Sequence, residues 1–287
     1  MLSLYVCNLI IPGDPDTLTL TTPAGPWTLN KMPEFAATKA RITATNVRPQ
    51  QLPIGETYFL ENPVGMSNGG AAAVETAIAE LTPILLAASY ATGLSATVER
   101  ATMGSDVSIV QATHYWPRVR AMGSGAPVVT TTAEFIHFVE TFVQTWPVEG
   151  QTEKARVLVH TWLDALACWS MEDLYLSATT LLQIIVATEA KKQGVATLNF
   201  YPGVTAAAQR MNITVLGPDF KNMRNELVHD GQLIGARFAG PRAACNQVVT
   251  DVLNWFDTYV HVALALGPVM KARFQPYDFS GLNAYSI

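Results

Sequence analysis

Residues 130–146 read T-T-T-A-E-F-I-H-F-V-E-T-F-V-Q-T-W, and this stretch indicates the architecture of the second half of the chain. Its apolar residues recur at i, i+3, i+4, i+7, i+8 and i+11 and so form one stripe along a helix: Phe135, Phe138, Val139, Phe142, Val143 and Trp146. Thr131 and Glu134 have the spacing of a capping box. The helix is therefore predicted to begin near Thr132.

More helices are predicted beyond it. A second carries Leu158, Trp162, Leu166 and Trp169 along one side. A third covers about 171–193 and ends at Gly194, after two lysines that suit a helix C-terminus. A fourth region, about 206–229, is predicted in two pieces broken near Gly217-Pro218, and a last helix covers about 241–266. Four or five helices with short connections predict a compact bundle.

The first half has a different texture. Residues 1–70 are rich in Pro, Thr and Gly, and the runs M-L-S-L-Y-V-C-N-L-I-I-P, L-T-L-T-T and A-R-I-T-A-T-N-V are typical of strands. A helix is predicted over 71–90, with Pro83 as a candidate break or kink, and V-S-I-V-Q-A-T-H-Y-W returns to strand character. The Gly-rich segment 121–127 is the best boundary. We therefore predict an α+β protein, with a β-rich domain over 1–121 and a helical bundle with a C-terminal tail over 128–287.

Composition limits the function classes. The chain is 49% hydrophobic and 14% charged, with a net charge of −5, so a packed core is expected and long disordered tracts are not. Non-specific coating of nucleic acid requires a basic surface, which this balance argues against. A small basic cleft that holds one phosphate remains compatible with it.

Cysteine usage and hydropathy predict a cytoplasmic protein. Cys7, Cys168 and Cys245 are an odd number, widely spaced and without C-x-x-C, which favours a reducing compartment over a disulfide framework. The N-terminus has no basic leader, and P-I-L-L-A-A-S-Y-A-T-G-L is too short to span a bilayer. No membrane association is expected.

Most signatures of catalytic chemistry are absent from the sequence. It contains no phosphate-binding P-loop, no H-E-x-x-H, no G-x-S-x-G and no dinucleotide fingerprint. His137, His160 and His261 occur singly on predicted helices, and His114 lies in a predicted strand, so each is expected to be a satisfied or surface residue. N-G-G at 68–70 is expected to be a plain turn. No metal site and no cofactor are predicted.

One stretch stands apart, R-N-E-L-V-H at 224–229, just before Gly231. On a helix, Asn225 and His229 share a face, whereas Arg224 and His229 diverge by about 140°. The two point at a single phosphate only if the helix unwinds before Gly231 or if a second copy contributes across a dimer axis. Asn225 could then orient the imidazole while Arg224 supplies charge.

The same residues carry a family resemblance. An arginine followed by asparagine, with a histidine five residues after the arginine, at the end of a late bundle helix resembles the signature of the HEPN superfamily. The preceding helix, with L-L-Q-I-I-V-A-T-E-A, resembles the HEPN helix that places an acidic residue, here Glu189, near the motif. The similarity covers about 130–266, and a β-rich region before it is similar to ApeA-like HEPN proteins of bacterial defence.

The resemblance implies a metal-independent endoribonuclease that acts as a homodimer, with Arg224, Asn225, His229 and Glu189 at its site. RNA supplies its own nucleophile, the 2′-hydroxyl, so the expected products carry a 2′,3′-cyclic phosphate and a 5′-hydroxyl. A structured RNA such as tRNA is one candidate substrate. An antiviral or toxin role implies a phage-derived trigger or a neutralising antitoxin as a further partner.

Three alternatives stay open at this point. The bundle could be a non-catalytic HEPN module that dimerises or binds RNA, nucleotide or protein. It could also be an unrelated helical interaction protein in which R-N-E-L-V-H is a surface helix end. Glu189 could be a solvated carboxylate opposite Lys192. The β-rich half would suit a sensor, a substrate-selection domain or a site for an inhibitory partner.

Overall fold

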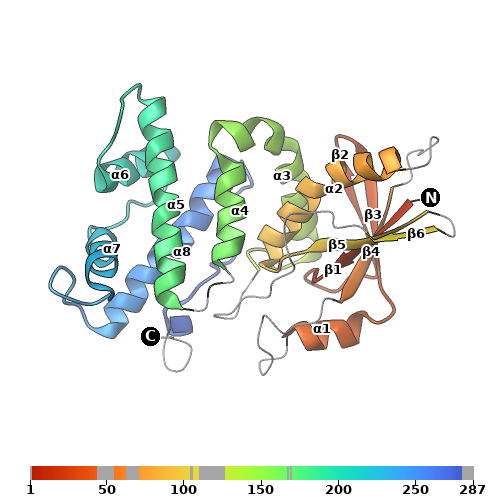
Figure 1. Ribbon diagram of the computed structural model, residues 1–287, viewed down its shortest axis with the longest axis horizontal. Helices are drawn as coiled ribbons and strands as arrows, with labels where there is room; N and C mark the ends of the chain where they lie inside the picture. The colour runs from red at the N-terminus through yellow and green to blue at the C-terminus, as the bar shows by residue number, and fades with distance from the viewer. Residues whose placement is uncertain are drawn as a thin grey trace. The chain divides into compact units, whose positions relative to one another are not determined.

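The computed structural model describes residues 2–43, 55–62, 71–103, 106–109, 127–166, 168 and 170–279 (Figure 1). The chain divides into two compact units. The sheet unit consists of Met1–Arg120 and Pro127–Pro147, and the helical unit consists of Ala121–Ala126 and Val148–Ile287. An antiparallel sheet followed by helices confirms the predicted α+β class.

The described strands of the sheet unit form a six-stranded sheet in the order β2-β3-β4-β1-β5-β6. Every neighbouring pair is antiparallel. Their bounds are β1 Leu2–Cys7, β2 Thr17–Thr22, β3 Gly25–Lys31, β4 Glu56–Asn62, β5 Thr97–Met103 and β6 Asp106–Ile109. Side chains of β2 alternate between exposed and buried, which places Leu18 and Leu20 in the core. The strands predicted at the N-terminus and at L-T-L-T-T are confirmed.

The strand predicted at A-R-I-T-A-T-N-V is wrong in its first four residues, because α1 (Phe35–Thr43) includes them. Phe35, Thr38 and Ile42 are buried at i, i+3 and i+7, which is the spacing of a helix. The ring of Phe35 lies 5.3 Å from that of Tyr58 on β4. Packing against the sheet therefore overrides the strand propensity of Ile and Thr here. The remainder of that run lies outside the described residues.

Two helices follow the predicted bounds closely. The helix α2 (Ala71–Thr92) continues through Pro83 without a break, and α3 (Thr132–Thr152) begins at the predicted residue. At the start of α3, the Glu134 amide donates to Thr131 Oγ1 at 3.1 Å. The return bond of the predicted capping box comes from the Thr130 amide, at 2.6 Å from Glu134 Oε2, and not from that of Thr131.

The first part of α3 belongs to the sheet unit, so the helical unit begins about twenty residues later than the sequence predicted. Phe138 stacks on Tyr90 of α2 with ring centroids 6.0 Å apart, and Glu140 accepts a hydrogen bond of 2.6 Å from the Thr21 amide. An apolar stripe predicts that a helix face is buried, but it does not identify the partner. The partner here is the sheet unit.

The helical unit contains α4 (Ala155–Ala165), α5 (Met171–Lys192), α6 (Phe200–Met211), α7 (Asp219–Asp230), α8 (Arg242–Ala263) and a short 3-10 helix, η2 (Pro276–Phe279). The predicted break of the fourth region near Gly217-Pro218 is confirmed, because it separates α6 from α7. Ser170 caps α5 by accepting from the Asp173 amide at 3.0 Å, and Gly194 follows its end with φ of 70°.

The core of the helical unit is aromatic. Trp162 of α4 and Phe256 of α8 are both fully buried, with ring centroids 4.8 Å apart. The indole of Trp162 donates to Asp257 Oδ1 at 3.0 Å, and Asp257 is paired with Arg273, which is also buried. Phe138 and Trp162, which lie on two of the predicted apolar stripes, are buried, and so is Phe256. Over the described ranges, no helix has the length and apolar character needed to cross a membrane.

Candidate nucleic-acid site on helix α7

The stretch R-N-E-L-V-H occupies the last two turns of α7. The helix begins after Pro218, whose missing amide is not needed there, and Asp219 in its first turn suits the positive end of the helix dipole. It ends at Gly231, which has φ of 69° and donates to the Leu227 carbonyl at 3.2 Å. The predicted helix end is confirmed, and α7 runs without unwinding through His229.

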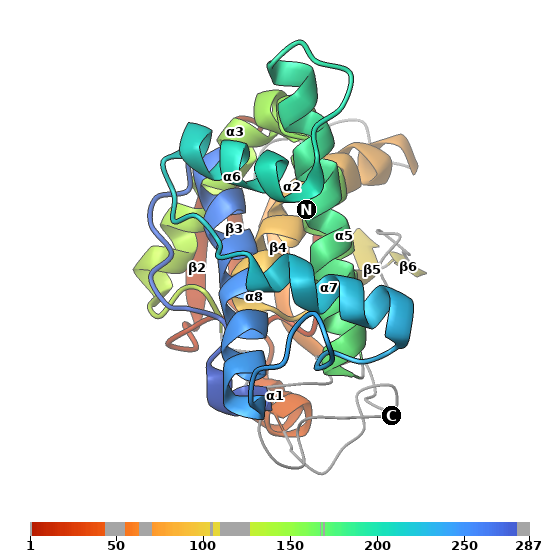
Figure 2. The same cartoon turned by 90° about the vertical axis from the view of Figure 1, so that its left-hand side faces the viewer.

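The inner side of α7 attaches it to the helical unit. Phe220, Met223 and Glu226 are buried, and the Tyr175 hydroxyl of α5 donates to the Phe220 carbonyl at 2.7 Å. Helix α7 contacts both α5 and α8, and in Figure 2 it crosses in front of them with its outer side toward the viewer. The orientation of the motif is therefore set by its buried neighbours.

Glu226, the third residue of the motif, is a structural residue that the sequence did not single out. It is 1% exposed, accepts a hydrogen bond from the Arg237 amide, and lies 3.6 Å from the Arg237 guanidinium. Arg237 also pairs with Asp230 at 2.6 Å. A Cβ at Gly235 would lie 2.5 Å from Glu226 Oε2. Glu226 thus fixes the loop after α7 and is turned away from the outer side.

The outer side of α7 forms a stripe that we call the α7 stripe. At about 100° per residue, its members span about 160° of the helix circumference. In order around the helix they are Arg224, Val228, Lys221, Asn225, His229 and Asn222, all half-buried or exposed. The stripe contains no acidic residue, although the whole chain has a net charge of −5. It is a local cationic surface of the kind that a phosphate backbone favours.

Arg224 lies at one edge of the α7 stripe and has no acidic partner within the described ranges. Its guanidinium carbon lies 5.0 Å from the centre of the Phe200 ring, at the start of α6. Its Nη1 is 3.5 Å from Asn225 Oδ1, at the limit of a hydrogen bond, and its buried Nε has no hydrogen-bond partner. The side chain is held by an aromatic ring, and its positive charge stays uncompensated.

His229 lies near the other edge of the stripe, beside Asn222. It is exposed, and it makes no hydrogen bond or ion pair with any residue that the structure describes. Asn225 lies between the two, about 100° from Arg224 and about 40° from His229 around the helix. One copy of the chain therefore brings Arg224 and Asn225 together but directs Arg224 and His229 to opposite edges.

Glu189 is not part of this arrangement. Its carboxylate is 2% exposed and accepts hydrogen bonds from Arg210 Nε at 2.6 Å and Gln193 Nε2 at 2.9 Å. Tyr175, which contacts the start of α7, precedes Glu189 by fourteen residues on α5, a separation of about 21 Å along the helix. The structure also excludes the solvated alternative, because Lys192 pairs with Glu153 instead.

Glu189 belongs to an ionic cluster at the other end of α5, in which the carboxylates are buried and the cations are exposed. Arg210 bridges Glu189 and Glu153, with Nη1 3.1 Å from Glu153 Oε1, and the Tyr259 hydroxyl donates to Glu153 Oε2 at 3.0 Å. Burial alone would raise the pKa of Glu153, but hydrogen bonds from Lys192, Arg210 and Tyr259 outweigh it and hold the pKa below its usual value. Two carboxylates and two cations compensate each other, so the cluster joins helices and leaves no charge for a ligand.

Other candidate residues do not form a second site. Among the described residues, no group of three or more His, Cys, Asp or Glu side chains is placed to hold a metal ion. His137 is exposed on α3, and buried His261 lies with Nδ1 3.2 Å from the Gly267 carbonyl oxygen. His114, Trp169 and N-G-G at 68–70 lie outside the described residues.

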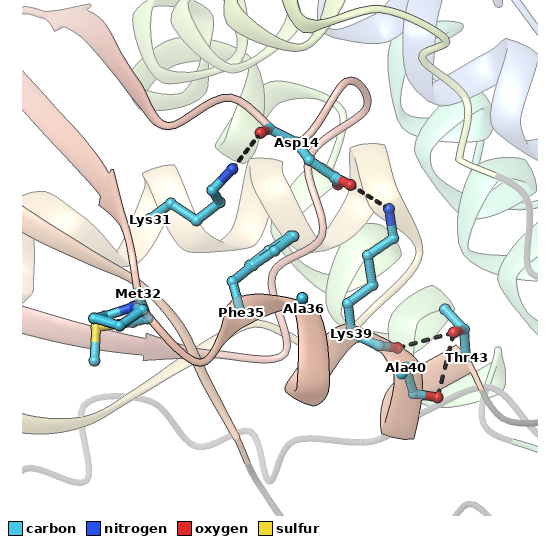
Figure 3. A pocket seen from close by; sticks show the side chains of 9 residues that line it. Asp14, Lys31, Met32, Phe35, Ala36, Lys39, Ala40 and Thr43 are labelled. Atoms are coloured by element: carbon cyan, nitrogen blue, oxygen red, sulfur yellow. Dashed lines mark hydrogen bonds and ion pairs between the residues drawn. The ribbon is translucent and has the colours of Figure 1, made fainter.

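A pocket of about 460 Å³ lies in the sheet unit, between α1 and the end of β3 (Figure 3). Its two lysines are already neutralised. Lys39 pairs with Asp14 at 2.5 Å, and Lys31 pairs with Asp16 at 2.5 Å and donates to the Asp14 carbonyl at 2.9 Å. Apolar side chains, among them Met32 and Phe35, complete the lining. The pocket offers no free cation comparable to Arg224.

Comparison with known proteins adds no relative to this description, because no family model, curated protein or solved structure matches the chain.

Proposed function

We propose that the helical unit is a metal-independent endoribonuclease of the HEPN type, with the α7 stripe as its active surface. The observation that carries the proposal is that Arg224 and the exposed His229 lie on one acid-free helix face, and that neither has an acidic partner among the residues that the structure describes. Such a face supplies both a fixed positive charge and a proton-transfer group. An anti-phage defence or toxin role, with a phage-derived trigger or an antitoxin as partner, belongs to the same proposal.

The proposed reaction uses the substrate's own nucleophile. The 2′-oxygen attacks the adjacent phosphorus while its proton passes to His229, and the bond from phosphorus to the 5′-oxygen breaks. The leaving 5′-oxygen is protonated, again by a histidine, which gives a 2′,3′-cyclic phosphate and a 5′-hydroxyl. Arg224 stabilises the negative charge that develops on the non-bridging oxygens of the phosphorane, an effect commonly worth about 3 kcal/mol. Asn225 orients the imidazole of His229.

The divergence of Arg224 and His229 makes a homodimer part of the proposal. In one copy they occupy opposite edges of the α7 stripe, about 140° apart, so one phosphate does not contact both. Two α7 helices that meet across a two-fold axis would bring the arginine of one copy toward the histidine of the other. Val228, 48% exposed between Lys221 and Arg224 around the helix, offers an apolar contact at such an axis.

A second candidate is a non-catalytic module that binds RNA or dimerises through the same helix. The observation that favours it is the placement of Glu189. The resemblance assigns this residue to the site, but here it lies at the far end of α5 and is paired with Arg210 of α6. A surface that lacks this acid retains its cations and can still bind phosphate.

The deciding experiment incubates tRNA and single-stranded RNA with the wild type and with Arg224→Ala, Asn225→Ala and His229→Ala, and analyses the product ends. The enzyme hypothesis expects cyclic phosphate ends, loss of cleavage in the arginine and histidine variants, a smaller loss in the asparagine variant, and no effect of EDTA. All-DNA substrates should survive, because they lack the 2′-hydroxyl.

Matched controls are Arg242→Ala and His137→Ala, which remove an exposed arginine and an exposed histidine from other helices. Both should cleave as the wild type does. Cleavage that persists without His229 would place the chemistry elsewhere, and RNA binding without any cleavage would favour the non-catalytic module.

A further inference from the structure

The start of α6 places two aromatic rings beside the α7 stripe. Phe200 and Tyr201 are consecutive, both are half-buried, and both contact the buried ring of Phe220 on α7. The ring centroids lie 5.6 Å apart for Phe200 and Phe220, and 5.8 Å apart for Tyr201 and Phe220. An aromatic ring that is partly open and lies next to a cationic helix face can take part in binding an unpaired base.

The two rings differ in their relation to Arg224. The guanidinium carbon lies 5.0 Å from the centre of the Phe200 ring, whereas no such contact links Arg224 to Tyr201 among the described residues. A cation held over an aromatic face is stabilised by the ring quadrupole. Phe200 therefore helps to hold the Arg224 guanidinium in place. Among the described residues, no carboxylate competes with a ligand for its charge.

We infer that Phe200 and Arg224 form a stacking subsite for one unpaired RNA base, next to the phosphate that the proposed nuclease would engage. The base stacks on the free face of the guanidinium, whose other face lies over the Phe200 ring, and the N–H edge of the guanidinium stays directed toward the backbone. This inference rests on the proposed RNA substrate and narrows it to single-stranded segments, because bases within a duplex are already stacked.

The charge of the chain and of the α7 stripe also favours single-stranded RNA over duplex. The chain has a net charge of −5, and the α7 stripe contributes only Lys221 and Arg224 as permanent cations. Few phosphate contacts provide little affinity at physiological salt. Base stacking, which is worth about 1–3 kcal/mol per base, supplies affinity that does not depend on charge. A weakly cationic site beside an open ring therefore suits single strands better than duplex.

The test measures binding separately from cleavage, by fluorescence anisotropy with a labelled 2′-O-methyl RNA that has no free 2′-hydroxyl. Phe200→Leu keeps an apolar side chain against Phe220 but removes the aromatic face, and should weaken binding of the single strand about tenfold. Phe200→Trp should retain wild-type affinity. The matched control is Tyr201→Leu, which removes a ring from the same turn without touching the Arg224 contact and should change affinity less than about twofold. Circular dichroism melting checks that each variant is folded.

Two further ligands show whether a base is recognised. The same oligonucleotide annealed to its complement should bind more weakly than the single strand and should not distinguish wild type from Phe200→Leu. An oligonucleotide with abasic positions should also remove that distinction. A folded Phe200→Leu protein that binds single strands as the wild type does would overturn the subsite, as would an equal loss on duplex or no RNA binding by the wild type.

The outcome separates this inference from the proposed function. Weakened binding by Phe200→Leu, together with absence of cleavage of ordinary RNA by the wild type, would retain the stacking subsite and reject the nuclease. Cleavage that depends on Arg224 and His229 but not on Phe200 would retain the nuclease and reject the subsite. If both hold, Phe200→Leu should raise KM for single-stranded RNA and leave kcat close to the wild-type value.

Discussion

Arg210 Nε donates a hydrogen bond of 2.6 Å to Glu189 Oε2, and this ion pair joins α6 to the end of α5. Glu189 is 2% exposed, and the same guanidinium also contacts Glu153, so the arginine bridges two buried carboxylates. A buried carboxylate with this arrangement has a structural reason to be present. Its role can be separated from catalysis by experiment.

Glu189→Ala is expected to destabilise the helical unit without removing RNA cleavage by the folded protein. The change removes a buried carboxylate and its hydrogen bonds from Arg210 and Gln193. Because Arg210 is itself exposed and keeps Glu153 as a partner, the loss should be about 1–2 kcal/mol. Urea unfolding should show the loss. The exposed acid of α8 serves as control, because Asp251→Ala should stay within about 0.5 kcal/mol of the wild type. Loss of cleavage with unchanged stability would return Glu189 to the active site.

Gly203→Ala is expected to destabilise, although alanine is the better helix former. A Cβ at Gly203 of α6 would lie 2.5 Å from Cγ1 and 2.9 Å from Cγ2 of Val186 on α5. A β-branched side chain has little freedom to move aside, so the clash should cost about 1–3 kcal/mol and outweigh a propensity gain of about 1 kcal/mol. Thermal or urea unfolding shows whether the free energy of unfolding falls or rises in the variant.

The matched control for Gly203 is Gly217, where an added Cβ meets nothing within 4 Å. Gly217→Ala should be neutral or slightly stabilising. If Gly203→Ala also proved stabilising, the close approach of α5 and α6 would be disproved.

The stability of the helical unit should fall below about pH 6.5 because of His261. Burial lowers the pKa of this imidazole, and Arg273 lowers it further, against the opposing effects of Asp257 and the Gly267 carbonyl. As the pH falls, His261 of the unfolded chain binds a proton before His261 of the folded protein does. This contribution to stability is therefore present above the unfolded pKa and is lost as the pH falls below it. The free energy of unfolding should decrease between pH 6.5 and pH 5.5.

His261→Gln should reduce that pH dependence, because glutamine can donate to the Gly267 carbonyl and does not titrate. The free energy of unfolding, measured by urea at pH 7.5 and at pH 5.5, should differ less in the variant than in the wild type. The exposed His137 provides the comparison, and His137→Gln should keep the wild-type difference. An equal difference in all three proteins would contradict the assignment.

Dimerisation should depend on Val228. If two α7 helices meet across a two-fold axis, Val228→Glu places two like charges at the contact and should shift the protein toward the monomer in light scattering. Val157 of α4 is equally exposed, at 48%, and Val157→Glu should leave the oligomeric state unchanged. A wild type that is monomeric with and without RNA would count against the composite site. A dimer that both variants keep would place the interface elsewhere.

Local patterns in the chain were enough to predict most of its helices. The spacing of Phe135, Phe138 and Phe142, the Gly217-Pro218 break and the glycine after α7 each act within a few residues, and each was found where predicted. Helix periodicity and termination depend on neighbouring residues, so they can be inferred without knowing the fold. The strand predicted across Ala40–Thr43 failed because propensity there yields to packing on the sheet.

Which helices and side chains contact one another depends on residues far apart in the sequence, and no local sequence pattern indicated these contacts. The stripe of α3 was visible, but only tertiary contacts such as Phe138 with Tyr90 assigned its first part to the sheet unit. Glu189 was a candidate because of its place in the chain, and it pairs instead with a residue twenty-one positions away. Arg224 was identifiable from its motif, whereas the ring of Phe200 beneath its guanidinium was not. Helical periodicity predicts which side of α7 is open, and only the packing of α5, α6 and α8 against α7 decides what lies beside it.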